Sequence, residues 1–432
     1  MGRRAAVGTI MLAALAALIT ASAAVEPVRY DDAGSYSDGV ALTSMGDFTV
    51  LPAGSGAQLL PGSRVLATTI ADDAGLGTAA DLATAQQRWL ADGWLPEDPR
   101  YRDLVANALL DMRVLSTGGA PVASGNHNWR YVWPRDSSFV AVAFAASGHG
   151  EDAVTVLTFL QQVQAPDGSF EARYLPDGSG PPDARPAQTD GTGWALWALD
   201  AVIAAAPASQ ARELLRRFEP LRTRSTEYLL AQVDNPRSLP APSPDYWEHR
   251  ENVVTLGTAA PVLAGLEASA RLAGRADDHA TQALATDATE RLRASITLNF
   301  GEHGYGRYPG PSRPDAASAF LLPPFQSTAL HGAEQAWAAS VPTMMRPAGG
   351  LAPGALWREQ NLSWTPQTAL YALAAASVGE AEQARDWLDW LTAHRTPLGA
   401  LPEKVNAAGE PSGPAPLAWT CALVVLTVVE LE

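Results

Sequence analysis

The sequence predicts an all-α protein in which helix pairs form a ring or a superhelix. From about residue 79 onward, segments with apolar residues at i, i+3, i+4 and i+7 follow one another without strands between them. Long loops rich in proline and glycine recur after every second helix. A parallel-sheet fold would alternate strands with helices, so this pattern argues against one. Loops of this length commonly carry functional residues.

The periodicity places helices at 79–95, 99–115, 136–147, 151–164, 191–206, 209–232, 252–273, 278–298, 315–322, 330–340, 364–377, 380–394 and 415–431. The long loops are 116–134, 165–189, 233–247, 299–314, 341–363 and 395–414. Residues 25–78 mix glycine, serine and aspartate with short apolar runs, so we expect an N-terminal extension that is mostly loops. No linker interrupts 79–432, which we expect to form one functional domain.

Composition and charge exclude several classes of function. The 432 residues carry 46 Asp and Glu against 30 Lys and Arg, and the resulting net charge of −16 argues against nucleic-acid binding through a basic face. The single cysteine, Cys421, excludes an intrachain disulfide and a cysteine-based zinc site. The seven histidines are scattered, and no nucleotide-binding or serine-hydrolase motif is present, so we expect no cofactor and no metal.

The first 24 residues have the pattern of a secretory signal peptide. Arg3 and Arg4 precede an uncharged stretch from Ala5 to Ile19, and Ala21-Ser22-Ala23 follows as a small-residue cleavage pattern. An uncleaved membrane anchor is the alternative. We expect the mature protein to be secreted or held in the cell envelope, without membrane contact after cleavage, and to be a monomer.

Three loop motifs combine charged and aromatic residues. The first, Tyr131-Val132-Trp133-Pro134-Arg135-Asp136, runs into a helix. Asp136 could cap that helix, or Arg135 and Asp136 could present hydrogen-bond donors and acceptors to neighbouring hydroxyl groups while Trp133 offers an apolar face.

The second motif, Trp247-Glu248-His249-Arg250, ends a proline-rich loop. A carboxyl group buried beside an indole has the raised pKa that a general acid needs, whereas an ion pair between Glu248 and Arg250 is the structural alternative. The third motif, Leu401-Pro402-Glu403-Lys404, would by default place Glu403 on the solvated surface.

Further candidates lie where loops lead into helices. Asp190 of Gln188-Thr189-Asp190-Gly191 is either a helix cap or a sugar ligand, and Trp364 and Trp419 each lie at the start of a helix. Tryptophan is also unusually common, with 13 residues against 10 Tyr and 9 Phe, and about half of them lie near these motifs. Carboxylates, arginines and tryptophans together are typical of sites that bind sugars.

These motifs together resemble the glucoamylase family of inverting glycoside hydrolases, glycoside hydrolase family 15. The resemblance is carried, in the family's order, by Tyr131-Val132-Trp133-Pro134-Arg135-Asp136, Gln188-x-Asp190-Gly191, Trp247-Glu248-His249-Arg250, Trp364-x-x-x-Thr368, and Leu401-Pro402-Glu403-Lys404 with Pro416-Leu417-Ala418-Trp419-Thr420. It spans about 79–432 and implies an (α/α)₆ toroid with long functional loops on one rim.

The resemblance also implies roles for individual residues. Glu248 corresponds to the general acid and Glu403 to the general base, and inversion places two such carboxylates about 6.5–9.5 Å apart. Arg135, Asp136 and Trp133 would bind the glucose unit at the non-reducing end of an α-glucoside substrate, and Arg250 would orient the acid or hold the sugar. The remaining substrate-binding candidates are Tyr131, Asp190, Trp247, Trp364 and Trp419.

Two departures from the family keep alternatives open. His249 stands where fungal members carry a second glutamate, and residues 25–78 are too few for the large N-terminal β-sandwich of bacterial members. The alternatives are glucodextranase or trehalase specificity on the same machinery, or a non-catalytic carbohydrate-binding protein. An unrelated enzyme on an α/α toroid, such as a polysaccharide lyase, would show a Tyr/His/Arg base cluster, which the sequence does not offer.

Overall fold

The structure is a computed structural model that describes residues 35–67 and 73–432. The signal peptide predicted at residues 1–24 lies outside the described residues, as does part of the predicted N-terminal extension. Residues Tyr36–Glu432 form one compact unit. Within the described residues, no helix is long and apolar enough to cross a membrane.

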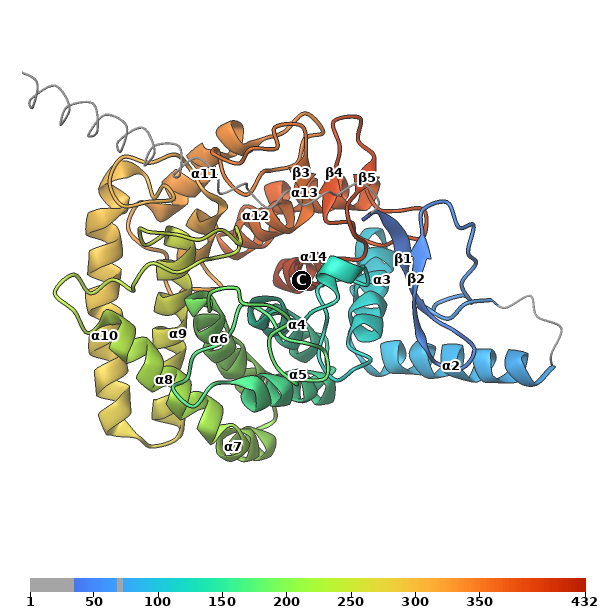
Figure 1. The fold of residues 1–432 in the computed structure, drawn as a ribbon, viewed down its shortest axis with the longest axis horizontal. Coiled ribbons are helices and arrows are strands. Elements are labelled where there is room, and N and C mark those ends of the chain that lie inside the picture. The colour runs from blue at the N-terminus through green and yellow to red at the C-terminus, as the bar shows by residue number, and fades with distance from the viewer. Residues whose placement is uncertain (1–34, 68–72) are drawn as a thin grey trace, which may run out of the picture. The chain divides into compact units, whose positions relative to one another are not determined.

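Six buried segments form an inner ring (Figure 1). They are α4 (Pro134–Ala146), α6 (Thr189–Ala205), α9 (Leu256–Arg275), the 3₁₀ segment η3 (Ala316–Leu321), α12 (Thr365–Ser377) and α14 (Ala418–Leu431). Each segment packs against the next, and α14 packs against α4, so the ring is closed. The inner segments are apolar nearly all round, as helices surrounded by other helices must be.

An outer layer of helices covers this ring. It consists of α3 (Pro99–Leu115), α5 (Gly150–Val163), α8 (Glu219–Val233), α10 (His279–Asn299), α11 (Ala333–Met344) and α13 (Ala381–Ala393). Each outer helix packs on one or two inner segments; α10, for example, lies outside α9, whereas α8 contacts both α6 and α9 (Figure 1). Two concentric layers of six define an (α/α)₆ toroid, which confirms the predicted fold class.

Most helix boundaries lie within four residues of the expected ones, but the helix expected at 79–95 begins six residues earlier, at Asp73. Two other segments differ in kind. The segment expected as one helix over 209–232 is two helices, α7 (Ala208–Arg217) and α8, because Phe218 ends the first and Pro220 lies in the first turn of the second. The helix expected over 315–322 is the 3₁₀ segment η3, which Pro314 and Pro323 flank on either side. The remaining helical pieces are α2 (Asp73–Asp92), η1 (His127–Trp129) and η2 (Gly301–His303).

In the part of the chain that the structure describes, two small antiparallel sheets accompany the helices. The hairpin of β1 (Ser37–Leu42) and β2 (Phe48–Pro52) pairs Val40 with Val50 and packs beside α3 (Figure 1). The second sheet has the order β3 (Ser363–Trp364), β4 (Lys404–Val405) and β5 (Pro411–Ser412). Its register places Trp364 opposite Lys404, which brings two of the sequence motifs together.

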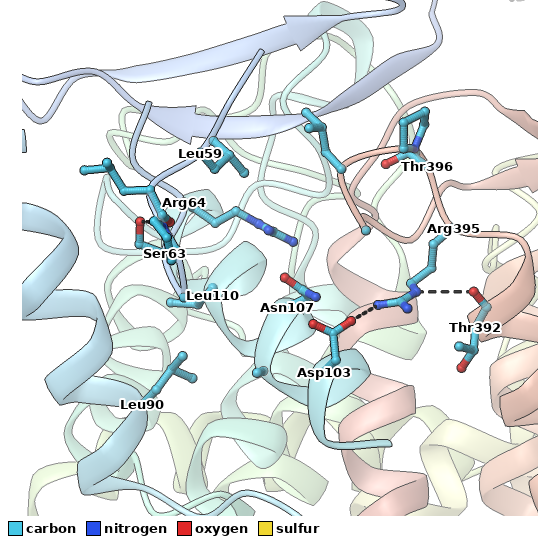
Figure 2. A pocket seen from close by; sticks show the side chains of 17 residues that line it. Leu59, Ser63, Arg64, Leu90, Asp103, Asn107, Leu110, Thr392, Arg395 and Thr396 are labelled. Carbon is cyan, nitrogen blue, oxygen red and sulfur yellow. Dashed lines mark hydrogen bonds and ion pairs between the residues drawn. The ribbon is translucent and has the colours of Figure 1, made fainter. Parts of the chain in front are cut away.

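A cavity of about 610 Å³ lies between the loop that carries Arg64, helix α3, and residues 392–399, which span the end of α13 and the loop after it (Figure 2). The charged groups in its wall are paired. Arg64 is buried against Asp111, and Arg395 donates to Asp103 at 2.8 Å. None of the residues that line it also lines the pocket that contains the sequence motifs, described below.

The buried imidazole of His149 predicts a pH dependence of stability. Its ring is stacked on Trp89 with 3.7 Å between ring centroids, and burial lowers its pKa from 6.5 to about 4. The unfolded chain therefore binds a proton that the folded chain excludes, so the free energy of unfolding should fall as the pH is lowered from 6.5 towards 4. Denaturant unfolding at several pH values should show a shallower fall for His149→Gln than for the wild type. Equal slopes would contradict this assignment.

Candidate active site

One pocket at the N-terminal ends of the inner helices collects most of the sequence motifs. Its volume is about 100 Å³, and its lining includes both Glu248 and Glu403. The other lining residues are Ala123, Trp129, Trp133, Arg135, Asp136, Tyr246, Pro353, Trp357, Trp364, Pro366, Gln367, Leu417 and Trp419. Trp133, Trp364 and Leu417 are the last residues before helices α4, α12 and α14. The start of each helix therefore fixes the position of the loop end that carries the lining residue.

Arg135 is the buried centre of this pocket. It lies in the first turn of α4 behind Pro134, which favours a helix start. Its guanidinium lies 2.9 Å from the Asp190 carboxylate, 3.1 Å from Glu248 and 3.6 Å from Asp136. Burial opposes the charge on Arg135, but the neighbouring carboxylates outweigh that cost and raise its pKa above the usual value.

The two aspartates around Arg135 are themselves perturbed. Burial raises the pKa of Asp136 to about 6, and the attraction of Arg135 only partly offsets this. Burial likewise raises the pKa of Asp190 to about 7 against the attraction of Arg135. Asp136 lines the pocket, whereas Asp190 lies behind Arg135 and does not. Perturbed carboxyl groups of this kind are typical of functional sites.

Glu248 reaches the pocket from a turn that an aspartate holds. The side chain of Asp245 accepts from the backbone N–H of Trp247 at 2.9 Å, and the Asp245 carbonyl accepts from the N–H of Glu248 at 2.8 Å. Glu248 itself has a left-handed backbone with φ of 56°. Such a conformation costs about 1–3 kcal/mol for a residue other than glycine and persists only where the surroundings enforce it.

The carboxylate of Glu248 is held by groups from other loops. It accepts from Gln188 Nε2 at 2.9 Å, from Arg135 at 3.1 Å and from Arg185 at 3.3 Å. The ion pair with Arg250 that the sequence offered as an alternative is replaced by these contacts, because the chain brings Arg135 and Arg185 to the same side of the turn. Arg250 is exposed and does not line the pocket.

A second buried arginine, Arg307, supports the turn that carries Glu248. The Arg307 guanidinium contacts Asp245 at 3.0 Å, Glu251 at 2.7 Å and Asp315 at 3.2 Å. It also lies 3.9 Å from the centre of the Trp247 ring. Burial opposes its charge, but Asp245 and Asp315 raise its pKa overall. We call Arg307, Asp245, Glu251 and Asp315 the Arg307 cluster.

Glu403 lies in a different environment from Glu248. It is 8% exposed, which contradicts the default expectation of a solvated surface residue. The indole N–H of Trp129 donates to Glu403 Oε1 at 3.0 Å, and Lys404 Nζ lies 3.5 Å from Oε2. Lys404 also lies 4.5 Å from the Trp364 ring, which faces it across the β3–β4 pair. A donor and a cation thus both face this carboxylate and favour its ionised form.

Aromatic rings form much of the remaining wall. Trp419 lies 5.4 Å from the Arg135 guanidinium, and Trp357 packs edge-on against both Trp247 and Trp364. His249 is stacked on Trp357 with 5.6 Å between ring centroids. These rings give the pocket flat apolar walls between its charged groups, as a sugar ring with polar edges and apolar faces requires.

The structure brings together both glutamates and five other predicted site residues. Trp133, Arg135, Asp136, Trp364 and Trp419 line the pocket, and Trp247 and Tyr131 pack directly behind it. Tyr131 also lies 4.2 Å from the Arg173 guanidinium. The roles of these residues remain predictions.

The candidate residues named from the sequence leave out several residues that contact the two glutamates, line the pocket or support the turn that carries Glu248. They are Trp129, Arg185, Gln188, Trp357 and Arg307. Trp129, Gln188 and Trp357 lie within or beside the recognised motifs, so their position in the chain was a usable signal. Arg185 and Arg307 lie in loops that nothing in their local sequence distinguishes, and only the folded chain places them near Glu248 and Trp247.

The Arg307 cluster predicts a large and specific stability effect. Arg307→Gln would leave the buried Asp245 and Asp315 without a counterion, which typically costs about 3–5 kcal/mol. The matched control is Arg313→Gln, which removes an exposed arginine from the same loop and should cost less than about 0.5 kcal/mol. Urea unfolding of the two variants measures both values, and equal stabilities would refute the role of the cluster.

Comparisons with known proteins agree with this architecture. No family model matches the chain. An uncharacterized glycosyl hydrolase of Methanocaldococcus jannaschii is 30% identical over 109 residues, which cover 24% of this chain and 17% of that protein. The chain therefore matches less than a fifth of the length of this relative.

Solved structures resemble the chain over most of its length. A glycosidase has a TM-score of 0.65 at 21% identity and covers 80% of this chain and 98% of its own. A bacterial glucoamylase complexed with acarbose has a TM-score of 0.68 at 17% identity, covering 83% of this chain and 59% of its own. The glucoamylase of Saccharomycopsis fibuligera has a TM-score of 0.58 at 14% identity, covering 80% of this chain and 93% of its own. The chain therefore has the glucoamylase-type (α/α)₆ fold that its loop motifs predict.

Proposed function

We propose that the chain is an exported, inverting, exo-acting α-glucosidase that releases glucose from the non-reducing end of α-linked oligo- or polysaccharides. The observation that carries this proposal is the presence of Glu248 and Glu403, which come from two separate loops, in one pocket. Inverting hydrolysis needs one carboxyl group that delivers a proton and a second that activates water from the opposite face of the sugar. The similar solved structures are those of glycosidases and glucoamylases, which supports the same class of reaction.

Glu403 suits the role of general base. Trp129 and Lys404 offer a hydrogen bond and a positive charge to its carboxylate, so the form that accepts a proton is favoured. In the proposed step, Glu403 removes a proton from a water molecule as that water attacks the anomeric carbon. The C–O bond to the leaving group breaks in the same step, and the configuration at the carbon inverts.

Glu248 suits the role of general acid, provided that substrate binding rearranges its contacts. Arg135 holds the Glu248 carboxylate, and the hydroxyl groups of a sugar would compete for the same guanidinium. Once this contact is displaced, Glu248 takes up a proton from solvent and delivers it to the glycosidic oxygen as the C–O bond breaks. Arg135 and Asp136 then hold the terminal sugar by its hydroxyl groups, as a donor fork and an acceptor pair.

The size of the pocket supports exo action. A volume of about 100 Å³ is well below the 300–1,000 Å³ of sites that enclose larger ligands. We infer that it accepts the terminal ring of a chain and leaves the rest of the substrate outside, near Trp357 and His249.

One experiment separates the proposed reaction from its alternatives. The purified protein is incubated with maltose, maltotriose, isomaltose or trehalose, and the anomeric proton signals of released glucose are followed by NMR. Initial release of β-glucose is the expected result, and the preferred disaccharide identifies the linkage. Initial release of α-glucose would overturn the inverting mechanism, and binding without hydrolysis would favour a carbohydrate-binding protein.

Substitution of either glutamate should abolish most of the activity. Glu248→Gln and Glu403→Gln are each expected to lower kcat about 10²–10⁴-fold while the protein stays folded, because each removes a proton-transfer group. The matched control is Glu410→Gln, an exposed glutamate on the loop between β4 and β5, near Glu403. Steady-state kinetics and circular dichroism check the three variants. A Glu403→Gln variant as active as Glu410→Gln would exclude Glu403 as the base.

The raised pKa of Asp136 predicts a pH dependence of substrate binding. An ionised carboxylate is the stronger acceptor for a sugar hydroxyl, so binding should weaken as the pH falls through about 6. The affinity for maltose is measured by calorimetry between pH 4.5 and 7.5 in a Glu403→Gln background, in which turnover is slow and residue 403 does not titrate. Adding Asp136→Asn should weaken binding at pH 7.5 and flatten the pH dependence. An unchanged pH profile would show that another group is responsible.

The proposal of export rests on residues 1–24 alone. Expression of the full chain in a secreting bacterial host, followed by N-terminal sequencing of the protein in the medium and the membrane fraction, tests it. A mature N-terminus near Val25 in the medium supports cleavage. An intact N-terminus in the membrane fraction would favour the anchor.

A further inference from the structure

The β1–β2 hairpin packs against the two loops that meet at Glu403. Its strand β1 is buried, although the sequence marks this region only as an N-terminal extension. One of the two loops, residues 123–131, carries Trp129. The other, residues 396–415, carries Glu403 itself.

The first loop is fitted closely under the hairpin at Gly125. A Cβ atom at Gly125 would lie 2.8 Å from the side chains of both Val40 and Val50 and 3.1 Å from the Phe48 ring. These distances are shorter than carbon atoms tolerate, so the hairpin can approach the loop this closely only where the loop has a glycine.

The same loop is attached to the hairpin beside Trp129. The guanidinium of Arg130 lies 4.7 Å from the centre of the Phe48 ring, which is cation–π geometry. The N–H of Ser124 donates to the Trp129 carbonyl at 3.1 Å and closes residues 124–129 into a turn. Contacts with the hairpin at both ends of this turn fix the direction in which the Trp129 indole points.

The second loop is attached to the hairpin through buried hydrogen bonds. Ser37 Oγ donates to the Ala415 carbonyl at 2.9 Å and accepts from the Ala415 N–H at 3.2 Å. Thr396 Oγ1 donates to the Asp38 carbonyl at 2.6 Å. The neighbouring Pro414 carbonyl accepts from the N–H of Glu403 at 2.9 Å. One hydrogen-bonded path therefore runs from β1 to the backbone of Glu403.

We propose that the β1–β2 hairpin is a positioning element that holds the Trp129 indole N–H against the Glu403 carboxylate. This role rests on the proposed function, in which Glu403 is the base. Phe48 and Gly125 act on the Trp129 side of the contact, and Ser37 acts on the Glu403 side. None of the three lines the pocket, so they act through Trp129 and Glu403 and not on the substrate.

The kinetic test uses Phe48→Leu, which keeps an apolar side chain and removes the ring beneath Arg130. We expect kcat to fall about 10- to 100-fold, because a small displacement of a catalytic group lowers the rate of the chemical step by this factor. KM should stay within about twofold of the wild-type value, because substrate binding is not weakened. Gly125→Ala is a second variant that pushes the loop from the hairpin and should have the same effect. The matched control is Met45→Ala, an exposed residue in the turn of the same hairpin, which should leave kcat unchanged.

A double-mutant cycle separates positioning from general destabilisation. In a Trp129→Phe background the N–H that the hairpin positions is absent, so adding Phe48→Leu should lower kcat by less than twofold. A merely structural role would give the same fold-loss with and without the Trp129 indole. Additive losses would therefore overturn the proposal.

A measurement without substrate keeps this inference distinct from the proposed function. The protein is labelled with 5-fluorotryptophan, and the ¹⁹F signal of Trp129 is assigned by its loss in Trp129→Phe. This signal should shift in Phe48→Leu and Gly125→Ala and stay in place in Met45→Ala. An unmoved signal overturns the inference even in an active enzyme. If the signal moves in these variants but the wild-type protein hydrolyses no glucoside, the proposed function is refuted, and with it any catalytic role of the hairpin.

Discussion

The guanidinium of Arg135 is buried among the carboxylates of Asp136, Asp190 and Glu248. A buried cation needs several partners because the free-energy cost of removing it from water exceeds the free energy that one surface ion pair contributes. The partners come from three separate parts of the chain: the start of α4, the start of α6 and the loop 234–255. The ion pairs of the buried Arg135 guanidinium therefore fix these segments relative to one another. The pocket between the segments follows from that constraint.

A second buried arginine, Arg307, completes the support of Glu248. Arg135 contacts the Glu248 carboxylate from the pocket side, and Arg307 holds Asp245, three residues earlier, from the other side. The left-handed conformation of Glu248 is tolerable because both ends of its turn are fixed in this way. Glu403 has a different support, in which the Trp129 indole N–H and Lys404 face its carboxylate. The loops that carry Trp129 and Glu403 pack on the β1–β2 hairpin. The two glutamates are thus positioned by independent parts of the fold.

Much of the fold was predictable because the helices are regular. The 3.6-residue period is local information, and it located α3, α5 and α13 to within a residue or two at each end. The ring closure of α14 onto α4 was not local, and the resemblance of the loop motifs supplied it. The prediction for 209–232 was wrong because one proline in the first turn of a helix ends the preceding one, although the apolar period continues through it.

The sequence by itself determined which residue types surround the site, since carboxylates, arginines and tryptophans at loop–helix boundaries are visible in the chain. Only the tertiary structure decided which of them meet. Arg250, one of the nearest charges to Glu248 in sequence, is exposed, while Arg135, 113 positions away, is its partner. The physical reason is that a side chain's partner is set by the direction of the backbone turn and by burial, and both arise only when distant segments pack together.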